Sequence, residues 1–288
     1  MTQVHKGRAN MLLGYPADAR LLIINADDFG MCHAINQGIF QSLQEGVVAS
    51  TSLMAPCPWA LHAMHLLREN PNSSFAVHLT ALCDTVVYRW GPLAPKEKVP
   101  SLLDQSGFFF TNDRMGEFLA QADLGELELE FRMQIEAVLA AQLRPTNLDW
   151  HCLANGGRPD ILEMTFGLAR EYNLALRVYD PAWVEKLQDQ GLPTDEYALL
   201  DSYALNTVDK SARYAQLLRE LPAGLSEWAV HPGLDHAELR TIEPVLPVRQ
   251  TDYEFVMSPQ ARDIIRQEGI IVLNYKPLQA VWQANRSS

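Results

Sequence analysis

The chain has 288 residues, of which 48% are hydrophobic and 20% are charged, a composition that is typical of globular proteins and excludes a disordered or collagen-like chain. Its 23 basic and 35 acidic residues give a net charge of −12, which argues against a nucleic acid or an anionic membrane as partner because phosphate contacts need a basic surface. We therefore expect a folded protein that binds neither nucleic acid nor membrane.

Residues 1–19 are expected to form a loose N-terminal extension, and residues 20–288 a single domain. In that domain, short runs of Val, Ile and Leu alternate with longer amphipathic stretches, which predicts strands alternating with helices. The expected strands cover residues 21–26, 49–54, 75–79, 146–151, 175–178, 227–231 and 270–274. The expected helices cover residues 34–44, 59–68, 124–142, 159–172, 211–221 and 258–268. Residues 81–112 are predicted to be an irregular insertion, of the kind that forms lids or binding loops.

This alternation predicts a parallel sheet, because a helix is the usual crossover between parallel strands. The number of units favours an α/β fold of the irregular (β/α) barrel type over an open doubly wound sheet. No GxGxxG sequence follows the first strand and no GxxxxGK[ST] sequence occurs, which disfavours dinucleotide and nucleoside triphosphate chemistry.

The four cysteines, Cys32, Cys57, Cys83 and Cys152, are widely spaced and contain no CxxC pair. Neither a disulfide framework nor a thiolate zinc cluster is expected, and a reducing compartment fits best. The apolar run near the N-terminus is too short for a signal peptide, and no run approaches the roughly 18 residues of a membrane span. We therefore expect a cytoplasmic protein.

Polar residues stand where several of the expected strands end. The first strand is followed by Asp27 and Asp28, the third contains His78, the fourth ends at His151, and the strand near residue 228 ends at His231. In a barrel the carboxyl ends of all parallel strands meet at one rim, where active sites are built. Two aspartates and three histidines are therefore expected to converge there.

Carboxylate and imidazole together suit a divalent metal such as Zn, Co, Ni or Fe, and three protein ligands leave positions open for water and substrate. Neighbouring side chains of a regular strand face opposite ways. At a strand end the chain turns, so that one aspartate of the pair can bind the metal while the other faces its water. Taken singly, an Asp-Asp pair after a strand is also typical of a turn or helix cap, and a lone histidine of a hydrogen-bonded structural residue.

The order of these residues along the chain resembles the YdjC-like carbohydrate deacetylases, which include the chitooligosaccharide deacetylases. The resemblance covers about residues 21 to 280 and is carried by Asn25-Ala26-Asp27-Asp28-Phe29-Gly30, Asn36-Gln37-Gly38-Ile39, Thr51-Ser52-Leu53-Met54, His78-Leu79-Thr80, Leu148-Asp149-Trp150-His151, Glu227, His231-Pro232-Gly233, Arg249, Asp252 and Gly269-Ile270-Ile271.

The resemblance implies a barrel related to polysaccharide deacetylases, one divalent metal ion (Zn or Mg) and hydrolysis of the N-acetyl group of an amino sugar or oligosaccharide. It implies Asp28, His78 and His151 as metal ligands, Asp27 as general base and His231 as candidate general acid. Such a base takes a proton from the attacking water, and such an acid gives one to the departing amine.

Around these residues, Glu227, Arg249 and Asp252 are candidates for orienting the acid or base, with a plain surface ion pair as the alternative for the last two. The substrate-binding residues stay open. Trp90, Trp150 and Trp183 are candidates for stacking on a sugar, and core or lid packing explains each equally well. A homodimer is one option for the assembly.

One segment departs from the family pattern. Many relatives carry further histidines at alternate positions after the equivalent of His151, where this chain has Leu153 and Asn155. Three other functions stay open, of which the altered segment supports the non-catalytic barrel. A metal-free glycosidase would use Asp27 with a second carboxylate and survive a chelator. A non-catalytic sugar-binding barrel would release no acetate. An iron oxygenase with two histidines and one carboxylate would consume oxygen.

Overall fold

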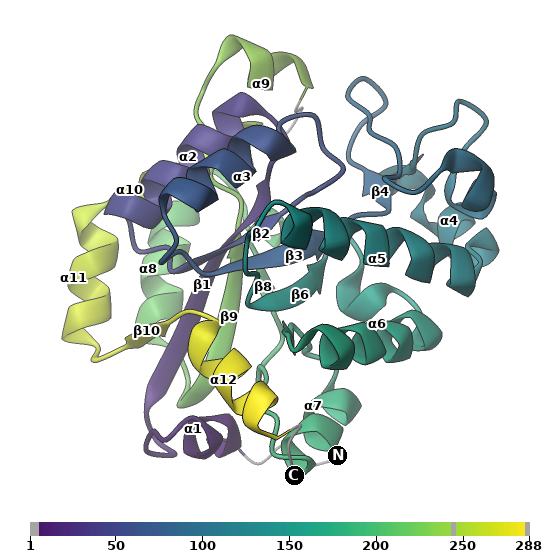
Figure 1. The fold of residues 1–288 in the computed structure, drawn as a ribbon. Coiled ribbons are helices and arrows are strands. Elements are labelled where there is room, and N and C mark those ends of the chain that lie inside the picture. The colour runs from purple at the N-terminus through teal and green to yellow at the C-terminus, as the bar shows by residue number, and fades with distance from the viewer. Residues whose placement is uncertain (1–5, 243–245, 286–288) are drawn as a thin grey trace.

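A curled parallel sheet forms the centre of the computed structural model, which describes residues 6–242 and 246–285 (Figure 1). Its strands stand in the order β7 (Ala175–Leu176), β6 (Asn147–Trp150), β3 (Phe75–Leu79), β2 (Ser50–Leu53), β1 (Arg20–Phe29), β9 (Gly224–Val230) and β8 (Leu200–Asp201). A further strand, β10 (Ile271–Leu273), pairs with β1 at Leu21 to Ile23. Every pairing is parallel. The sheet is a half-barrel whose order ends at β7 and β8, which confirms the expected irregular (β/α) barrel and its single domain.

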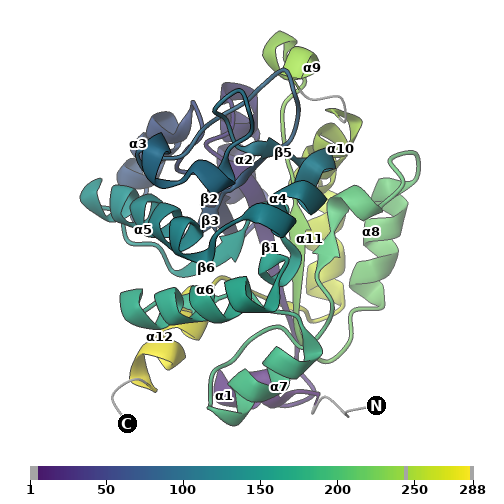
Figure 2. The same ribbon diagram turned by 90° about the vertical axis from the view of Figure 1, so that its right-hand side faces the viewer.

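Helices surround the outside of this sheet (Figures 1 and 2). They are α1 (Arg8–Leu12), α2 (His33–Glu45), α3 (Ala60–Glu69), α4 (Met115–Gln121), α5 (Leu124–Ala140), α6 (Pro159–Tyr172), α7 (Pro181–Asp189), α8 (Lys210–Arg219), α9 (Ala237–Ile242), α10 (Leu246–Met257), α11 (Pro259–Gln267) and α12 (Lys276–Ala284). Several begin where the sequence supplies a cap. Asp123 accepts hydrogen bonds from the first turn of α5, and Pro159 opens α6, because a side-chain acceptor satisfies the free amides and proline needs none.

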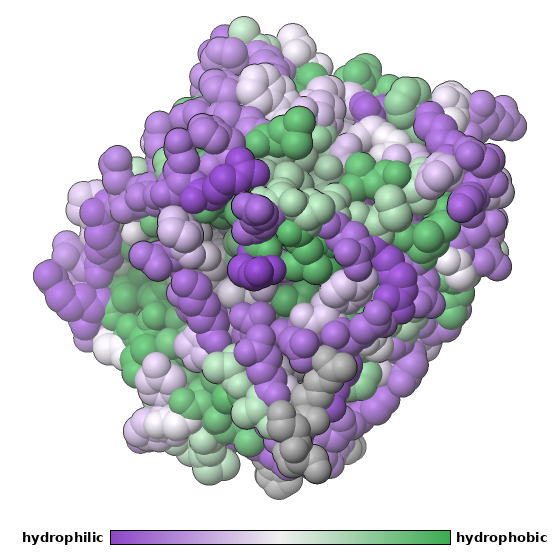
Figure 3. Space-filling model, viewed as in Figure 1, coloured by the Kyte–Doolittle hydropathy of each residue, from purple (hydrophilic) through white to green (hydrophobic). Residues whose placement is uncertain are grey.

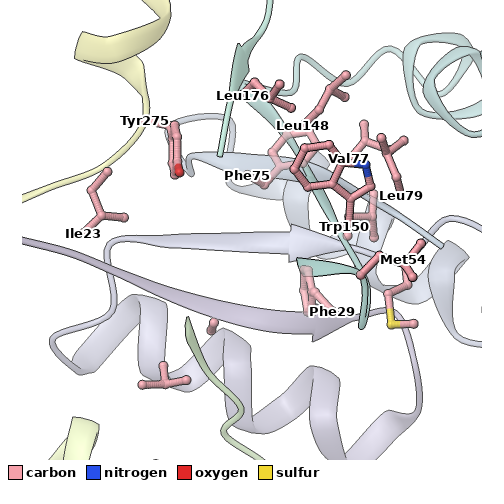
Figure 4. Packing of buried hydrophobic residues seen from close by; sticks show 14 of the residues in the cluster. Ile23, Phe29, Met54, Phe75, Val77, Leu79, Leu148, Trp150, Leu176 and Tyr275 are labelled. Atoms are coloured by element: carbon pink, nitrogen blue, oxygen red, sulfur yellow. The ribbon is translucent and has the colours of Figure 1, made fainter. Parts of the chain in front are cut away.

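The two faces of the strands differ in chemistry. On β3, Phe75, Val77 and Leu79 alternate with Ala76 and His78, and successive side chains of a strand point to opposite faces. Figure 4 shows these three apolar side chains beside Leu148 and Trp150 of β6. The other face carries polar side chains, which are buried and hydrogen-bond to one another across the half-barrel; they are Asn25, Ser52, His78, Asp149, Arg177 and Glu227.

The insertion is more regular than expected. It contains the parallel pair β4 (Leu82–Cys83) and β5 (Phe110–Thr111), and two short 3-10 helices, Lys96–Lys98 and Pro100–Leu102. Trp90 and Phe109 are buried, and the Trp90 ring packs edge-on against the ring of His151 outside the insertion. The prediction of an irregular segment is therefore wrong for β4 and β5, which are too short to show a periodic pattern.

The N-terminal segment is also ordered from residue 6, whereas residues 1–5 lie outside the described part. Helix α1 is anchored by the carboxylate of Glu196, which accepts hydrogen bonds from the backbone amides of Gly7 and Ala9 at 3.0 and 3.1 Å. The Asn10 side chain is buried and donates to the carbonyls of Pro16 and Ala19. Residues 6–19 are packed rather than loose, because long-range polar contacts of this kind leave no local sequence signal.

The face drawn in Figure 3 is mostly hydrophilic, with smaller hydrophobic areas between the polar side chains. Within residues 6–242 and 246–285, no helix has both the length and the apolar character that crossing a membrane would require.

Candidate metal centre and its cavity

The five residues expected at the rim line one cavity of about 500 Å³. Asp27 and Asp28 come from the end of β1, His78 from β3, His151 directly follows β6, and His231 directly follows β9. The cavity thus lies at the carboxyl ends of the parallel strands, as expected for a barrel site.

A bulge in β1 allows both aspartates to face this cavity. The pairing of β1 with β2 shifts register between Ala26 and Phe29, and Asp28 has a φ of 75°. A non-glycine residue in this left-handed region is uncommon and is found where a site requires it. The extra residue of a bulge reorients the side chain that follows it. Asp27 and Asp28, which a regular strand would point to opposite faces, therefore both reach the cavity.

Asp28, His78 and His151 form a compact, buried cluster. The Oδ1 atom of Asp28 lies 3.6 Å from Nε2 of His78 and 3.3 Å from Nδ1 of His151. One ligand atom from each of the three lies within 4.8 Å of the other two. The other oxygen of Asp28, Oδ2, accepts a hydrogen bond from Arg249 at 2.8 Å, which leaves Oδ1 facing the two imidazoles.

Each histidine of the cluster contacts a carboxylate through its second ring nitrogen. His78 Nδ1 lies 2.8 Å from Asp149 Oδ1, and His151 Nε2 lies 2.8 Å from Asp84 Oδ1. Carboxylates in this position fix the ring orientation of metal-binding histidines and increase their basicity. One carboxylate oxygen and two oriented imidazole nitrogens therefore fit a divalent cation such as zinc.

Asp27 is held by a buried arginine. Arg177, which follows β7, donates to Oδ2 and Oδ1 of Asp27 at 2.8 and 3.0 Å. The same guanidinium donates to Glu227 at 2.7 Å and lies 3.1 Å from Asp149. Glu227 in turn accepts a hydrogen bond from the hydroxyl of Tyr275. This network crosses the interior of the half-barrel and fixes the carboxylate of Asp27.

His231 is positioned by two groups from outside its strand. Its Nδ1 atom lies 2.8 Å from Oγ of Ser202, and its backbone amide donates to Oδ2 of Asp252 at 2.8 Å. Asp252 is itself held by Lys210 at 2.5 Å and by the hydroxyl of Tyr214 at 2.8 Å. Because Nδ1 contacts Ser202, Nε2 is the ring nitrogen of His231 that can exchange a proton with a molecule in the cavity.

Glu227, Arg249 and Asp252, the candidates for orienting the acid or base, are all buried. Arg249 and Asp252 contact different residues of the site. Arg249 binds Asp28, whereas Asp252 binds the backbone of His231, so the alternative of a surface ion pair between them is wrong. The orienting roles themselves stay predictions.

Neighbouring charges shift the pKa values of the side chains in and beside the cluster. Burial alone would raise the pKa of Asp27, but the Arg177 guanidinium and His78 outweigh it and hold that pKa below its usual value. The pKa of Asp28 is likewise lowered, because Arg249 and hydrogen bonds from His151 and His78 overcome the cost of burial. Burial would lower the pKa of His78, but the Asp149 carboxylate raises it to about 9. Both aspartates are therefore ionised at neutral pH.

Sequence reasoning did not single out Arg177, Asp84, Asp149 or Ser202 as site residues. Arg177 was the most visible of them, since it interrupts an apolar strand in the run Ala-Leu-Arg-Val. Of the three tryptophans, Trp150 lines the cavity. Trp90 is buried and donates to the Leu82 carbonyl, and Trp183 packs against Phe166, so packing accounts for both.

Comparison with known proteins adds the following matches. The model of the family described as YdjC-like protein matches residues 21–267. A carbohydrate deacetylase of Enterococcus faecalis is 29% identical over 263 residues, covering 89% of this chain and 97% of that protein. A chitooligosaccharide deacetylase of Yersinia enterocolitica is 30% identical over 274 residues, covering 89% and 98%. A crystal structure from Enterococcus faecalis V583, described as a "putative cellobiose-phosphate cleavage protein", is 29% identical with a TM-score of 0.78 and covers 90% of this chain and 99% of that one.

Proposed function

The chain belongs to the YdjC-like family, and from this premise we propose that it is a metal-dependent carbohydrate deacetylase. Its reaction is the hydrolysis of the N-acetyl group of an amino sugar or chitooligosaccharide, which yields acetate and a free amine. The observation that carries the proposal is the buried Asp28, His78 and His151 cluster with Asp27 beside it, all of which line one cavity.

Asp28, His78 and His151 are the residues that would hold the cation. When bound, a divalent cation supplies Lewis-acid polarisation of a carbonyl and lowers the pKa of a bound water. We favour zinc over magnesium, because two imidazoles suit zinc whereas magnesium prefers an all-oxygen set.

Proton movement is assigned to two side chains that approach the cavity from different strands. Asp27 is the general base that accepts the proton of the attacking water, and Arg177 keeps its carboxylate ionised and oriented. His231 is the general acid that donates a proton from Nε2 to the departing amine. An amide nitrogen leaves poorly without this proton, so an acid is required beside the base.

The cavity favours a sugar without a negative charge. Its lining includes the carboxylates of Asp27, Asp28, Asp84 and Asp201. Arg177 is the one arginine or lysine among the described lining residues, and it is already bound to three carboxylates. A phosphate on the sugar would therefore meet no lysine and no further arginine among these lining residues. Tyr179 and Tyr203 offer aromatic surface of the kind on which sugar rings pack.

The direct test combines elemental analysis of the purified protein with an acetate-release assay on N-acetylglucosamine oligomers. We expect bound divalent metal and release of acetate that a chelator abolishes. Release of reducing ends in the presence of chelator would instead support the metal-free glycosidase. Metal and sugar binding without acetate would support the non-catalytic barrel.

The variant Asp27→Asn separates the base from the metal ligands. We expect metal content to be retained and turnover to fall by about 10²–10⁴-fold, because the amide keeps the shape but cannot accept the proton. Asp209→Asn, at an exposed position, is the matched control. Loss of metal in Asp27→Asn would refute the assignment.

The variant His78→Ala tests the ligand set. We expect metal content to fall, with activity lost in parallel, because one of three protein ligands is removed. His65→Ala serves as control, since that side chain is exposed on α3. A fully metallated and active His78→Ala protein would rule out the ligand role.

Three further expectations stay predictions. They are the cytoplasmic location, a homodimer as one form of assembly, and the division at residue 19. Cell fractionation tests the first and the mass of the purified protein in solution tests the second. Deletion of residues 1–19 tests the third, because a separable extension can be removed without loss of the fold.

A further inference from the structure

A second set of metal-binding atoms lies on the opposite side of the His151 ring from Asp28. Cys152 Sγ lies 3.3 Å from His151 Nε2, and Asp84 Oδ1 lies 2.8 Å from the same nitrogen. The sulfur and that oxygen are 3.6 Å apart. One sulfur, one nitrogen and one oxygen thus converge on a common point, with each atom within 4.8 Å of the others.

A tight turn at Cys152 and the insertion that carries Asp84 bring these atoms together. Cys152 has a φ of 61°, and the amide of Leu153 donates to the carbonyl of His151 at 2.8 Å, which closes a tight three-residue turn. The turn places the Cys152 thiol beside the ring of the preceding residue. Asp84 arrives from the insertion, directly after β4. All three residues line the cavity.

The arrangement is unsuited to a cysteine nucleophile. In a Cys-His-Asp triad the thiol and the carboxylate contact different nitrogens of the imidazole, so that the ring can pass on a proton. Here both contact Nε2, while Nδ1 faces Asp28. Donor atoms that gather on one side of one nitrogen are suited to holding a cation.

We propose that Asp84, His151 and Cys152 form a second cation site, selective for thiophilic divalent ions such as Zn²⁺ or Cd²⁺, in which the His151 ring bridges the two ions. Binding displaces one proton from the Cys152 thiol and one from Nε2 of His151, and both go to solvent. A thiolate and an imidazole favour soft ions over Mg²⁺. Arg249 lies 3.8 Å from the other oxygen of Asp84, Oδ2, so Oδ1 is the oxygen assigned to the ion.

The second cation site does not depend on the proposed deacetylation, but an ion bound there would affect that reaction. An ion held by Asp84 and Cys152 occupies part of the cavity that a sugar would enter. Excess Zn²⁺ is therefore expected to inhibit acetate release by at least about 10-fold, corresponding to about 1.4 kcal/mol, and excess Mg²⁺ to have no such effect.

The test is a Cd²⁺ titration of the full-length protein without substrate, followed by equilibrium dialysis and by the ultraviolet absorption of a cadmium–thiolate bond. The unmodified protein is expected to bind two ions and to show the band. Cys152→Ala is expected to bind one ion without the band. His78→Ala is expected to lose the first ion and keep the band.

Cys57→Ala is the matched control, because Cys57 is buried and its sulfur contacts Met54 rather than the three donors; the band is expected to persist in it. Cys152→Ser provides a second variant if Cys152→Ala does not fold. One bound ion in the unmodified protein, or a band that survives replacement of Cys152, would overturn the proposal. Failure of acetate release when only the first ion is bound, as expected for Cys152→Ala, would count against the deacetylation alone.

Discussion

Arg177 joins three buried carboxylates in one network, those of Asp27, Asp149 and Glu227. Its planar guanidinium can contact all three at once, whereas a lysine presents a single point charge. In the described part of the chain this side chain makes no hydrogen bond or ion pair with the three proposed metal ligands, and it reaches Asp149 behind His78 instead. Arg177 is therefore assigned as a positioning residue for the base.

Replacement of Arg177 is expected to separate turnover from metal binding. In Arg177→Lys we expect turnover to fall by about 10–100-fold, in the range seen for residues that orient an active group, with metal content and KM little changed. In Arg177→Met the three carboxylates lose their cation, and we expect the free energy of unfolding to fall by about 3–5 kcal/mol.

Steady-state kinetics, elemental analysis and denaturant unfolding check these outcomes. Arg266→Lys is the control, because that side chain is 78% exposed and pairs with Asp263 at the surface. Full activity of Arg177→Met would contradict the positioning role.

At the scale of elements, strand β1 and helix α1 show how contacts made far along the chain decide local structure. The strand continues through a bulge to Phe29 because its end pairs with β2 while its start pairs with β10. Helix α1 has only 5 residues, too few for an isolated helix in water. It is held by Glu196, whose carboxylate also accepts from the Leu225 amide of β9 at 3.1 Å. The helix therefore depends on the barrel beneath it.

Glu196→Ala is expected to release the N-terminal segment. It removes the acceptor of three backbone amides, those of Gly7 just before α1, Ala9 on α1 and Leu225 on β9, and an unsatisfied buried donor costs about 1–3 kcal/mol. We expect lower stability by at least this amount and faster proteolysis within residues 6–19. Limited digestion followed by mass spectrometry checks the site of cleavage, with Glu185→Ala on the exposed side of α7 as control. An unchanged digestion pattern would contradict the anchoring role of Glu196.

For the whole molecule, the polar interior of the half-barrel links stability to pH. Asp195 is 1% exposed, and burial together with the neighbouring Glu227 raises its pKa well above the usual 3.8. The folded protein therefore keeps a proton that the unfolded chain loses once the pH exceeds about 3.8. Because the folded state then binds more protons, this residue lowers the free energy of unfolding as pH rises from there to its folded pKa.

Asp195→Asn should remove this pH dependence. Relative to the unmodified protein, the variant is expected to gain stability as pH rises above 4, by at most about 1.4 kcal/mol for each pH unit while the proton difference lasts. Denaturant unfolding between pH 4 and 8 measures the difference, with exposed Asp113→Asn as control. A difference between variant and parent that is constant over this range would contradict the protonated state of Asp195.

Helix prediction failed where the buried face of a helix is charged. The residues that α10 buries include Arg249 and Asp252 beside Val248 and Phe255, so its apolar spacing is broken and no helix was expected there. The short helices α7 and α12 were missed for a related reason, since each buries only a few apolar side chains. Longer helices with a continuous apolar stripe, such as α5, were predicted close to their bounds.

The sequence by itself determined the longer strands and helices, their parallel arrangement in a barrel-like sheet, and the arrival of Asp28, His78 and His151 at one rim, because apolar periodicity is local and parallel strands end on the same side. Only the tertiary structure decided which polar groups meet across the interior. Arg177 and Asp27 are 150 residues apart, and Asp84 and His151 come from different segments. Such contacts depend on strand register and on the bulge in β1, to which no local pattern of residues corresponds.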